Sequence, residues 1–122
     1  MSTVTQLIDR YIAMWNETDG KSRRDLIAAV WTDDAIYVDP VLQADGHAGI
    51  DTMVQAVHQR FPGHRFRRTS EVDTHHDRVR FNRQLAPESG APAVEGVDFG
   101  VMSGERLQAI TGFFNQASSA AR

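Results

Sequence analysis

The chain has 122 residues with a formal net charge of -3, 41% hydrophobic residues and no cysteine. This length supports one compact core, so we expect a single domain over residues 1–122, without disulfides, cysteine nucleophiles or thiolate-held metals. The mild negative charge provides no field that would attract nucleic acid or an anionic membrane surface, so we expect neither partner.

The first quarter of the chain has the spacing of two amphipathic helices. Apolar residues recur every three or four positions over residues 4–15, and Thr3 is a natural cap for this helix. After a turn at residues 19–20, Ser22 can cap a second helix whose apolar side ends at Trp31. The chain is therefore expected to open with a helical hairpin.

A change of period after the second helix marks a short strand. Residues 35–39 alternate between two faces, and Pro40 ends the strand because it lacks a backbone donor. We expect a loop at residues 43–47. Apolar spacing over residues 50–61 then predicts a third helix, which the Pro-Gly pair at 62–63 stops.

The rest of the chain has the alternation and turn residues of a sheet. The expected segments are two antiparallel strands within residues 64–86 around a turn near 73–77, a loop at 87–92, a strand at 94–102, a turn at 103–106 and a last strand at 107–114. We expect the tail at 117–122 to fray. This order indicates an α+β domain in which three N-terminal helices and one short strand pack on a curved antiparallel sheet.

One strand, residues 94–102, carries different side chains on its two faces. Val97, Phe99 and Val101 share one face, while Asp98 shares the other with glycines. If Asp98 faces inward, the apolar row lies on the outer face of the sheet, where a partner must cover it. We therefore predict a homodimer that packs through Val97, Phe99 and Val101. The opposite parity would put this row in the core and Asp98 in solvent.

Four parts of the sequence resemble the nuclear-transport-factor-2-like (NTF2-like) superfamily, and within it the SnoaL-like polyketide cyclases and the ketosteroid isomerases. They are RYIAMWN around Tyr11, WTDDAIYVDP at residues 31–40, Gly46 before the third helix, and VDFGVMSGERLQAITGFF at residues 97–114. The resemblance implies a cone in which helices and sheet enclose one deep pocket that is open at an end. It implies no single activity, because this scaffold also hosts dehydratases, hydrolases and binding modules.

The resemblance also implies catalytic positions. Asp39, directly before Pro40, stands where ketosteroid isomerases carry their base, and Tyr11 stands where they place a donor to the enolate oxygen. Gly100 occupies the third position of that site. Asp98 lies two residues earlier on the same face, about 6–7 Å away, and SnoaL-like cyclases similarly use a strand carboxylate as base. Burial would raise the pKa of Asp39 toward the range that suits proton transfer.

Each candidate also has an ordinary structural interpretation. Asp39 can cap a turn, and the phenol of Tyr11 can donate to a backbone carbonyl instead of a ligand. Arg83 can either pair with Asp98 or anchor a ligand carboxylate or enolate. The other candidates for binding a hydrophobic ligand, all of which can equally be core residues or ordinary hydrogen-bonding partners, are Trp15, Trp31, Tyr37, His58, Ile110 and Phe114.

The basic residues and the histidines give no further site. Seven arginines lie between residues 60 and 83, but interleaved acids favour a solvated sheet face over a nucleic-acid surface. The histidines lack the spacing of a metal set, and no phosphate-binding loop or nucleophile elbow is present. We therefore expect neither metal nor cofactor.

Two functions remain open from the sequence. The first is a cofactor-free isomerase, cyclase or hydratase for a small hydrophobic carbonyl compound, with Asp39 as base, Tyr11 as oxyanion donor and Asp98 as second carboxyl group. The second is a binding or interaction module without turnover, which Gly100 favours. No apolar run approaches the roughly 20 residues of a membrane span, and the start lacks the features of a signal peptide, so we expect a cytoplasmic protein.

Overall fold

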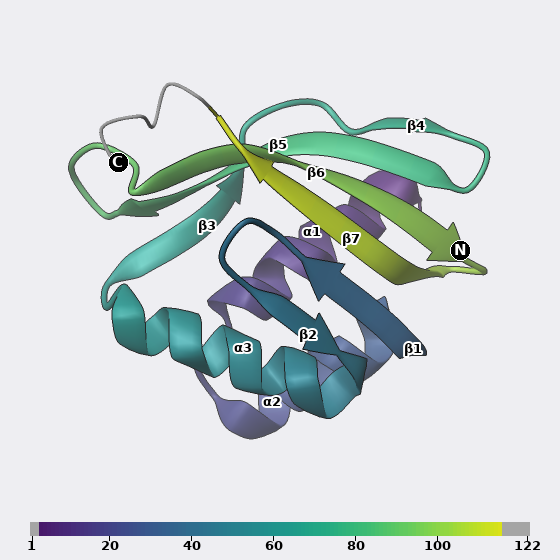
Figure 1. Ribbon diagram of the computed structural model, residues 1–122, viewed down its shortest axis with the longest axis horizontal. Coiled ribbons are helices and arrows are strands. Elements are labelled where there is room, and N and C mark those ends of the chain that lie inside the picture. Colours follow the sequence, from purple (N-terminus) through teal and green to yellow (C-terminus); the bar gives the residue numbers. More distant parts are fainter. Residues whose placement is uncertain (1–2, 116–122) are drawn as a thin grey trace.

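The computed structural model describes residues 3–115, which contain three helices and a curved sheet (Figure 1). The helices are α1 (Val4–Asn16), α2 (Gly20–Val30) and α3 (Gly46–Arg60), and the strands are β1 (Trp31–Val38), β2 (Gln43–Asp45), β3 (His64–Arg68), β4 (Asp73–His75), β5 (Arg78–Pro87), β6 (Val94–Ser103) and β7 (Arg106–Phe114). The tail that we expect to fray, residues 117–122, lies outside the described part. Within that part, no helix is long and apolar enough to cross a membrane.

The strands form one mixed sheet in the order β2-β1-β7-β6-β5-β3, and β4 pairs with β5 beside this path. All pairings are antiparallel except that of β1 with β7, which is parallel. The expectation of an antiparallel sheet is therefore wrong for the pairing of β1 with β7. The exception arises because β7 is fixed by its hairpin with β6, and β1 joins the sheet from the other end of the chain.

Local hydrogen bonds move three element boundaries from their expected places. Asp19 caps α2 by accepting a hydrogen bond from the backbone N–H of Ser22 at 2.9 Å, so the helix begins before Ser22. Trp31 leaves the helix and begins β1. The expected loop at residues 43–47 instead supplies β2, which pairs with the end of β1, and then the first turn of α3.

The helices lie together on one side of the curved sheet, and the core fills the space between them (Figure 1). The largest fully buried apolar side chains there include Ile8, Met14, Ile27, Trp31, Ile50, Phe81 and Leu107. On β6, Asp98 is fully buried between Gly96 and Gly100, whereas Phe99 is 42% exposed. The parity that the sequence left open therefore places Asp98 inward and the apolar row of β6 outward.

Candidate functional site

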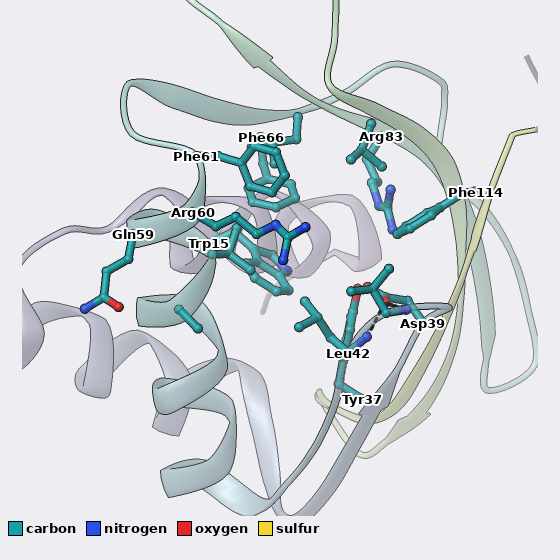
Figure 2. Close-up of a pocket in the computed structure, with 15 residues that line it drawn as sticks. Trp15, Tyr37, Asp39, Leu42, Gln59, Arg60, Phe61, Phe66, Arg83 and Phe114 are labelled. Atoms are coloured by element: carbon teal, nitrogen blue, oxygen red, sulfur yellow. Dashed lines mark hydrogen bonds between the residues drawn. The ribbon is translucent and has the colours of Figure 1, made fainter. Parts of the chain in front are cut away.

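A pocket of about 520 Å³ opens between the end of α3, strand β3, the turn after β1 and the last residue of β7 (Figure 2). Most of its wall is apolar. The aromatic side chains in the wall are Trp15, Tyr37, Phe61, Phe66 and Phe114, and the charged ones are Asp39, Arg60 and Arg83. Of the residues proposed from the sequence, Trp15, Tyr37, Asp39, Arg83 and Phe114 therefore border the pocket.

The turn after β1 fixes the carboxylate of Asp39 at the pocket wall. Its Oδ1 accepts hydrogen bonds from the backbone N–H groups of Val41 at 2.8 Å and Leu42 at 2.7 Å. Its Oδ2 accepts from the hydroxyl of Tyr37 at 2.6 Å. Asp39 thus caps a turn and also borders the pocket. Three of the roughly four acceptor positions of the carboxylate are occupied, which orients it and leaves about one for a ligand.

Tyr11, Arg83 and Asp98 form a buried polar group that we call the deep cluster. The hydroxyl of Tyr11 donates to Asp98 Oδ2 at 2.9 Å, and Arg83 Nη2 lies 3.3 Å from Asp98 Oδ1. The guanidinium of Arg83 also lies over the ring of Phe114, 5.5 Å from its centroid. Within this cluster, Arg83 borders the pocket, whereas Tyr11 and Asp98 lie behind it.

Glycines opposite the deep cluster leave room for its side chains. Gly96 pairs with Arg83 across β5 and β6, and Gly112 pairs with Asp98 across β6 and β7. A Cβ atom at Gly112 would lie 2.8 Å from Asp98 Oδ1, 3.0 Å from Arg83 Nη2 and 3.2 Å from the Cβ of Asp39. Asp98, on β6, and Asp39, just beyond the end of β1, therefore both approach Gly112, and the missing side chain there lets Asp39 lie close to the Arg83–Asp98 pair.

Burial and the neighbouring charges together raise the pKa of each member of the deep cluster and of the nearby Tyr37. Burial, with a further contribution from the negative charge of Asp98, raises the pKa of Tyr11 and of Tyr37 well above the ordinary value. Burial also raises the pKa of Asp98, although Arg83 and the Tyr11 hydrogen bond oppose this. Burial, the largest single influence, would lower the pKa of Arg83, but the charge of Asp98, the two tyrosines and the contact with Asp98 together outweigh it, so the pKa is raised. Both phenols are therefore neutral donors at pH 7.

Five of the residues proposed from the sequence, Asp98 of the deep cluster among them, lie outside the pocket wall. Trp31 and Ile110 are fully buried in the core, where Trp31 packs edge to face against Tyr11 with ring centroids 5.8 Å apart. The hydroxyl of Tyr11 is directed to Asp98 rather than to the pocket. His58 is half-buried, and its Nε2 lies 2.6 Å from the backbone carbonyl oxygen of Trp15. Core packing and internal hydrogen bonds thus account for their positions.

Several wall residues were not identified from the sequence. They are Val41, Leu42, Ala56, Val57, Gln59, Arg60, Phe61, Phe66, Leu85 and Val94. Phe66 had a usable signal, because it stands between exposed arginines on β3 and so must face the other side of the sheet. Arg60 had none, because the direction of a long side chain at a helix end does not follow from spacing.

No protein-family model and no curated protein matches the chain, but solved structures do. A SnoaL-like family protein from Agrobacterium tumefaciens str. C58, assigned as an isomerase, is 34% identical with a TM-score of 0.85, over 91% of this chain and 96% of that one. A protein of ketosteroid isomerase-like fold from Catenulispora acidiphila DSM 44928, in complex with trimethylamine, is 15% identical with a TM-score of 0.75, over 95% and 90%. A SnoaL-like protein from Jannaschia sp. CCS1, assigned as a polyketide cyclase, is 14% identical with a TM-score of 0.70, over 96% and 90%.

The two more distant structures show the fold alone, and with the helices, the curved sheet and the pocket they define the class. The molecule is an α+β cone of the NTF2-like type, similar to ketosteroid isomerase-like proteins. At 34% identity over nearly the whole of both chains, the A. tumefaciens structure goes further. The chain belongs to the SnoaL-like family.

Proposed function

We propose that the chain is a cofactor-free acid–base enzyme of the isomerase, cyclase or hydratase type, acting on a small hydrophobic carbonyl compound. The observation that carries this proposal is the carboxylate of Asp39 in the wall of a mainly apolar pocket. A carboxylate held partly out of water suits the removal of a proton from a C–H bond beside a carbonyl group. Aromatic side chains around it provide the surface for a hydrophobic substrate.

In the proposed reaction, the C–H bond beside the carbonyl breaks and its proton passes to Oδ2 of Asp39. The electron pair moves to the carbonyl oxygen and gives an enolate. Where the substrate has a carbon–carbon double bond next to the broken C–H bond, the enolate is conjugated with it, and return of the proton to the far carbon of that bond completes an isomerisation. The turn N–H groups and Tyr37 hold the base in one orientation, which lowers the entropic part of the barrier. Arg83 borders the same pocket, so its positive charge favours the enolate oxygen at a distance, without a direct hydrogen bond.

Tyr11 and Asp98 then take a different part from the one that the resemblance implies. Both lie behind the pocket wall and contact each other, and Asp98 is paired with Arg83. We propose that they are positioning residues that fix the guanidinium of Arg83, rather than groups that touch the substrate. This assignment needs no residue at the position that Gly100 occupies.

The alternative function is a small-ligand-binding module with the same pocket and no turnover. Two observations favour it: both oxygens of Asp39 already accept hydrogen bonds, and the Tyr11 hydroxyl is committed to Asp98. The ketosteroid isomerase-like protein from C. acidiphila holds trimethylamine, so a molecule of this fold takes up a small organic ligand.

The two functions separate in an exchange experiment that does not require the natural substrate. 2-Tetralone, a bicyclic ketone with acidic C–H bonds, is incubated with the protein in D2O, and proton NMR follows the loss of the signals beside the carbonyl. We expect the parent to accelerate exchange and Asp39→Asn to lower the protein-catalysed rate by about 10²- to 10⁴-fold. Asp39→Asn keeps the shape of the side chain, so the Kd for 2-tetralone should stay within about twofold of the parent's.

Asp25→Asn is the matched control, because Asp25 is an exposed residue of α2 away from the pocket. It removes the same charge and should exchange 2-tetralone as fast as the parent. Equal exchange by the parent and by Asp39→Asn would refute the assignment of the base. Saturable binding of 2-tetralone without any accelerated exchange would establish the binding module instead.

We also propose the homodimer expected from the sequence, with Val97, Phe99 and Val101 at its centre. Phe99 and Phe113 are 42% and 54% exposed, and their rings pack edge to face on the outer side of the sheet. Light scattering should give twice the chain mass at micromolar concentration, and Phe99→Glu should yield monomers. A monomeric parent would contradict the proposal. The cytoplasmic location is likewise proposed, and cell fractionation tests it.

A further inference from the structure

Three charged side chains border the pocket, and two of them have their charge matched inside the protein. Asp39 accepts hydrogen bonds from two backbone N–H groups and from Tyr37. Arg83 lies 3.3 Å from the carboxylate of Asp98. These two charges are therefore accounted for without a ligand.

Arg60 is the third charge, and it has no such partner. Among residues 3–115 it forms no ion pair and no hydrogen bond, and its guanidinium carbon lies 6.0 Å from the centroid of the Phe61 ring. Its place in the last turn of α3 is favourable for a cation, because helix dipoles are negative at that end. The side chain is directed into the pocket, where its guanidinium group approaches the aromatic wall (Figure 2).

Arg83 is less suitable as an anchor for a ligand anion. Its Nη1 has no hydrogen-bond partner among the described residues, but this atom is buried from solvent. It lies over the backbone of β6, where a Cβ atom at Gly96 would be only 3.0 Å from it. A ligand group would have to displace protein atoms to reach it. Arg60, by contrast, is exposed and presents the planar fork of donors that matches a carboxylate.

We infer that Arg60 binds an acidic group of the ligand, so that the ligand class is a hydrophobic carbonyl compound that also carries a carboxylate or an acidic hydroxyl group. This inference rests on the proposed function of the pocket, because it assigns the reacting carbonyl to the Asp39 end. Figure 2 shows Arg60 and Asp39 entering the pocket from different sides, with Trp15 and Phe66 along the wall. A ligand with its acid at Arg60 packs its apolar skeleton on these rings and keeps its negative charge away from Asp39.

The test compares 2-naphthoate with 2-naphthamide, which has nearly the same shape and no charge. Titration calorimetry at low salt should give about 10-fold tighter binding of 2-naphthoate by the parent, as expected for a charge-assisted hydrogen bond at a partly open site. Arg60→Gln should reduce this preference to about onefold and leave the binding of 2-naphthamide unchanged. Added salt should weaken the preference of the parent, because the Arg60 end is exposed to solvent.

Arg65→Gln is the matched control, because Arg65 is an exposed arginine on the face of β3 opposite to Phe66. It removes the same charge and should keep the preference for 2-naphthoate. Equal affinities of the parent for the two probes, a preference that survives Arg60→Gln, or no binding of either probe at millimolar concentration would overturn the inference.

Calorimetry reports binding alone, so this experiment fails independently of the proposed reaction. If the parent and Asp39→Asn both prefer 2-naphthoate and neither accelerates the exchange of 2-tetralone, the acid-binding role of Arg60 stands and the enzymatic function is refuted. If the parent exchanges 2-tetralone but shows no preference between the probes, the proposed function stands and Arg60 has no part in selecting the ligand.

Discussion

Asp39 and Asp98 both approach Gly112, yet their surroundings are opposite in kind. Asp98 lies in the middle of β6, is fully buried, and is paired with Arg83. Asp39 lies just beyond the end of β1, is half-buried, and is held by the N–H groups of its own turn. A carboxylate inside a strand can be enclosed by neighbouring strands, whereas one at a strand end keeps a side open to a ligand.

Each acid also accepts a hydrogen bond from a buried tyrosine. Tyr11 donates to Asp98 and Tyr37 donates to Asp39. Because burial raises the pKa of both phenols, both remain protonated and act as fixed donors. The same pair of residue types thus completes an enclosed charge cluster at one place and orients an accessible carboxylate at the other.

The largest effect is expected when the enclosed acid loses its cation. Arg83→Met leaves Asp98 fully buried without a counter-charge, which should lower the free energy of unfolding by about 3–5 kcal/mol. Urea denaturation measures the loss. Adding Asp98→Leu to this variant should recover much of it, because an apolar pair replaces the orphaned charge.

An exposed ion pair provides the control for that loss. Arg80 and Asp73 lie 2.6 Å apart, but their side chains are 57% and 61% exposed. Arg80→Met should therefore change the free energy of unfolding by less than about 1 kcal/mol. Similar losses for Arg80→Met and Arg83→Met would show that the deep cluster is not the buried charge pair described above.

The next largest effect is expected at the glycine between the two acids. Gly112→Ala places a methyl group 2.8 Å from Asp98 Oδ1 and 3.2 Å from the Cβ of Asp39, so one of them must move. This should cost about 1–3 kcal/mol of unfolding free energy and slow the exchange of 2-tetralone. Thermal denaturation and the NMR assay measure the two effects.

Gly49→Ala is the same chemical change at a place with room for it. A Cβ at Gly49 meets its nearest neighbour, the Cβ of Ala44, at 3.8 Å, and the residue lies within α3. There alanine should raise the free energy of unfolding by about 0.5–1 kcal/mol, because it favours the helix. If Gly49→Ala and Gly112→Ala lower the free energy of unfolding equally, the close contacts at Gly112 are not the cause of the loss there.

The sequence predicted the parts of this arrangement that depend on local pattern. The helical spacing placed Tyr11 on a buried face, and glycines around Asp98 marked an acid with space above the sheet. Proline after Asp39 marked the end of a strand. Each of these signals spans only a few residues, so it can be recognised without knowledge of the tertiary structure.

The sequence could not predict which distant residues meet. The parallel pairing of β1 with β7 brings Gly112 to Asp39, and no local pattern encodes a contact across more than 70 residues. For the same reason the sequence leaves the partner of the Tyr11 hydroxyl open between a ligand and a backbone carbonyl, whereas the structure shows that it donates to Asp98. Arg60 was grouped with surface arginines because only the fold shows that it reaches the pocket.

An effect of similar size, with a defined pH dependence, is expected for Tyr11→Phe. Removing a hydrogen bond to a buried carboxylate should cost about 1.5–3 kcal/mol at pH 7. Because that bond opposes the effect of burial, its loss should raise the pKa of Asp98 further above the ordinary value of 3.8. Carboxyl NMR titration measures this shift, and an unchanged or lowered pKa would contradict the described hydrogen bond.

The raised pKa of Asp98 also fixes the sign of its linkage to stability. Above pH 3.8 the unfolded chain has lost the proton that the native Asp98 still holds, so this proton stabilises the native state at low pH. The stabilisation is lost as the pH rises through the native pKa. In Tyr11→Phe the loss should extend to higher pH, which urea denaturation at several pH values will show.

The smallest effect is expected for Tyr37→Phe, which removes one of the three donors to Asp39. Two backbone N–H groups remain, and water in the pocket can replace the phenol, so the cost should be about 0.5–1.5 kcal/mol. The activation free energy of 2-tetralone exchange should rise by more than the free energy of unfolding falls, because the carboxylate becomes free to rotate toward solvent. A cost larger than that of Tyr11→Phe would mean that Asp39 is as enclosed as Asp98, and the distinction between an accessible base and a sealed charge cluster would then disappear.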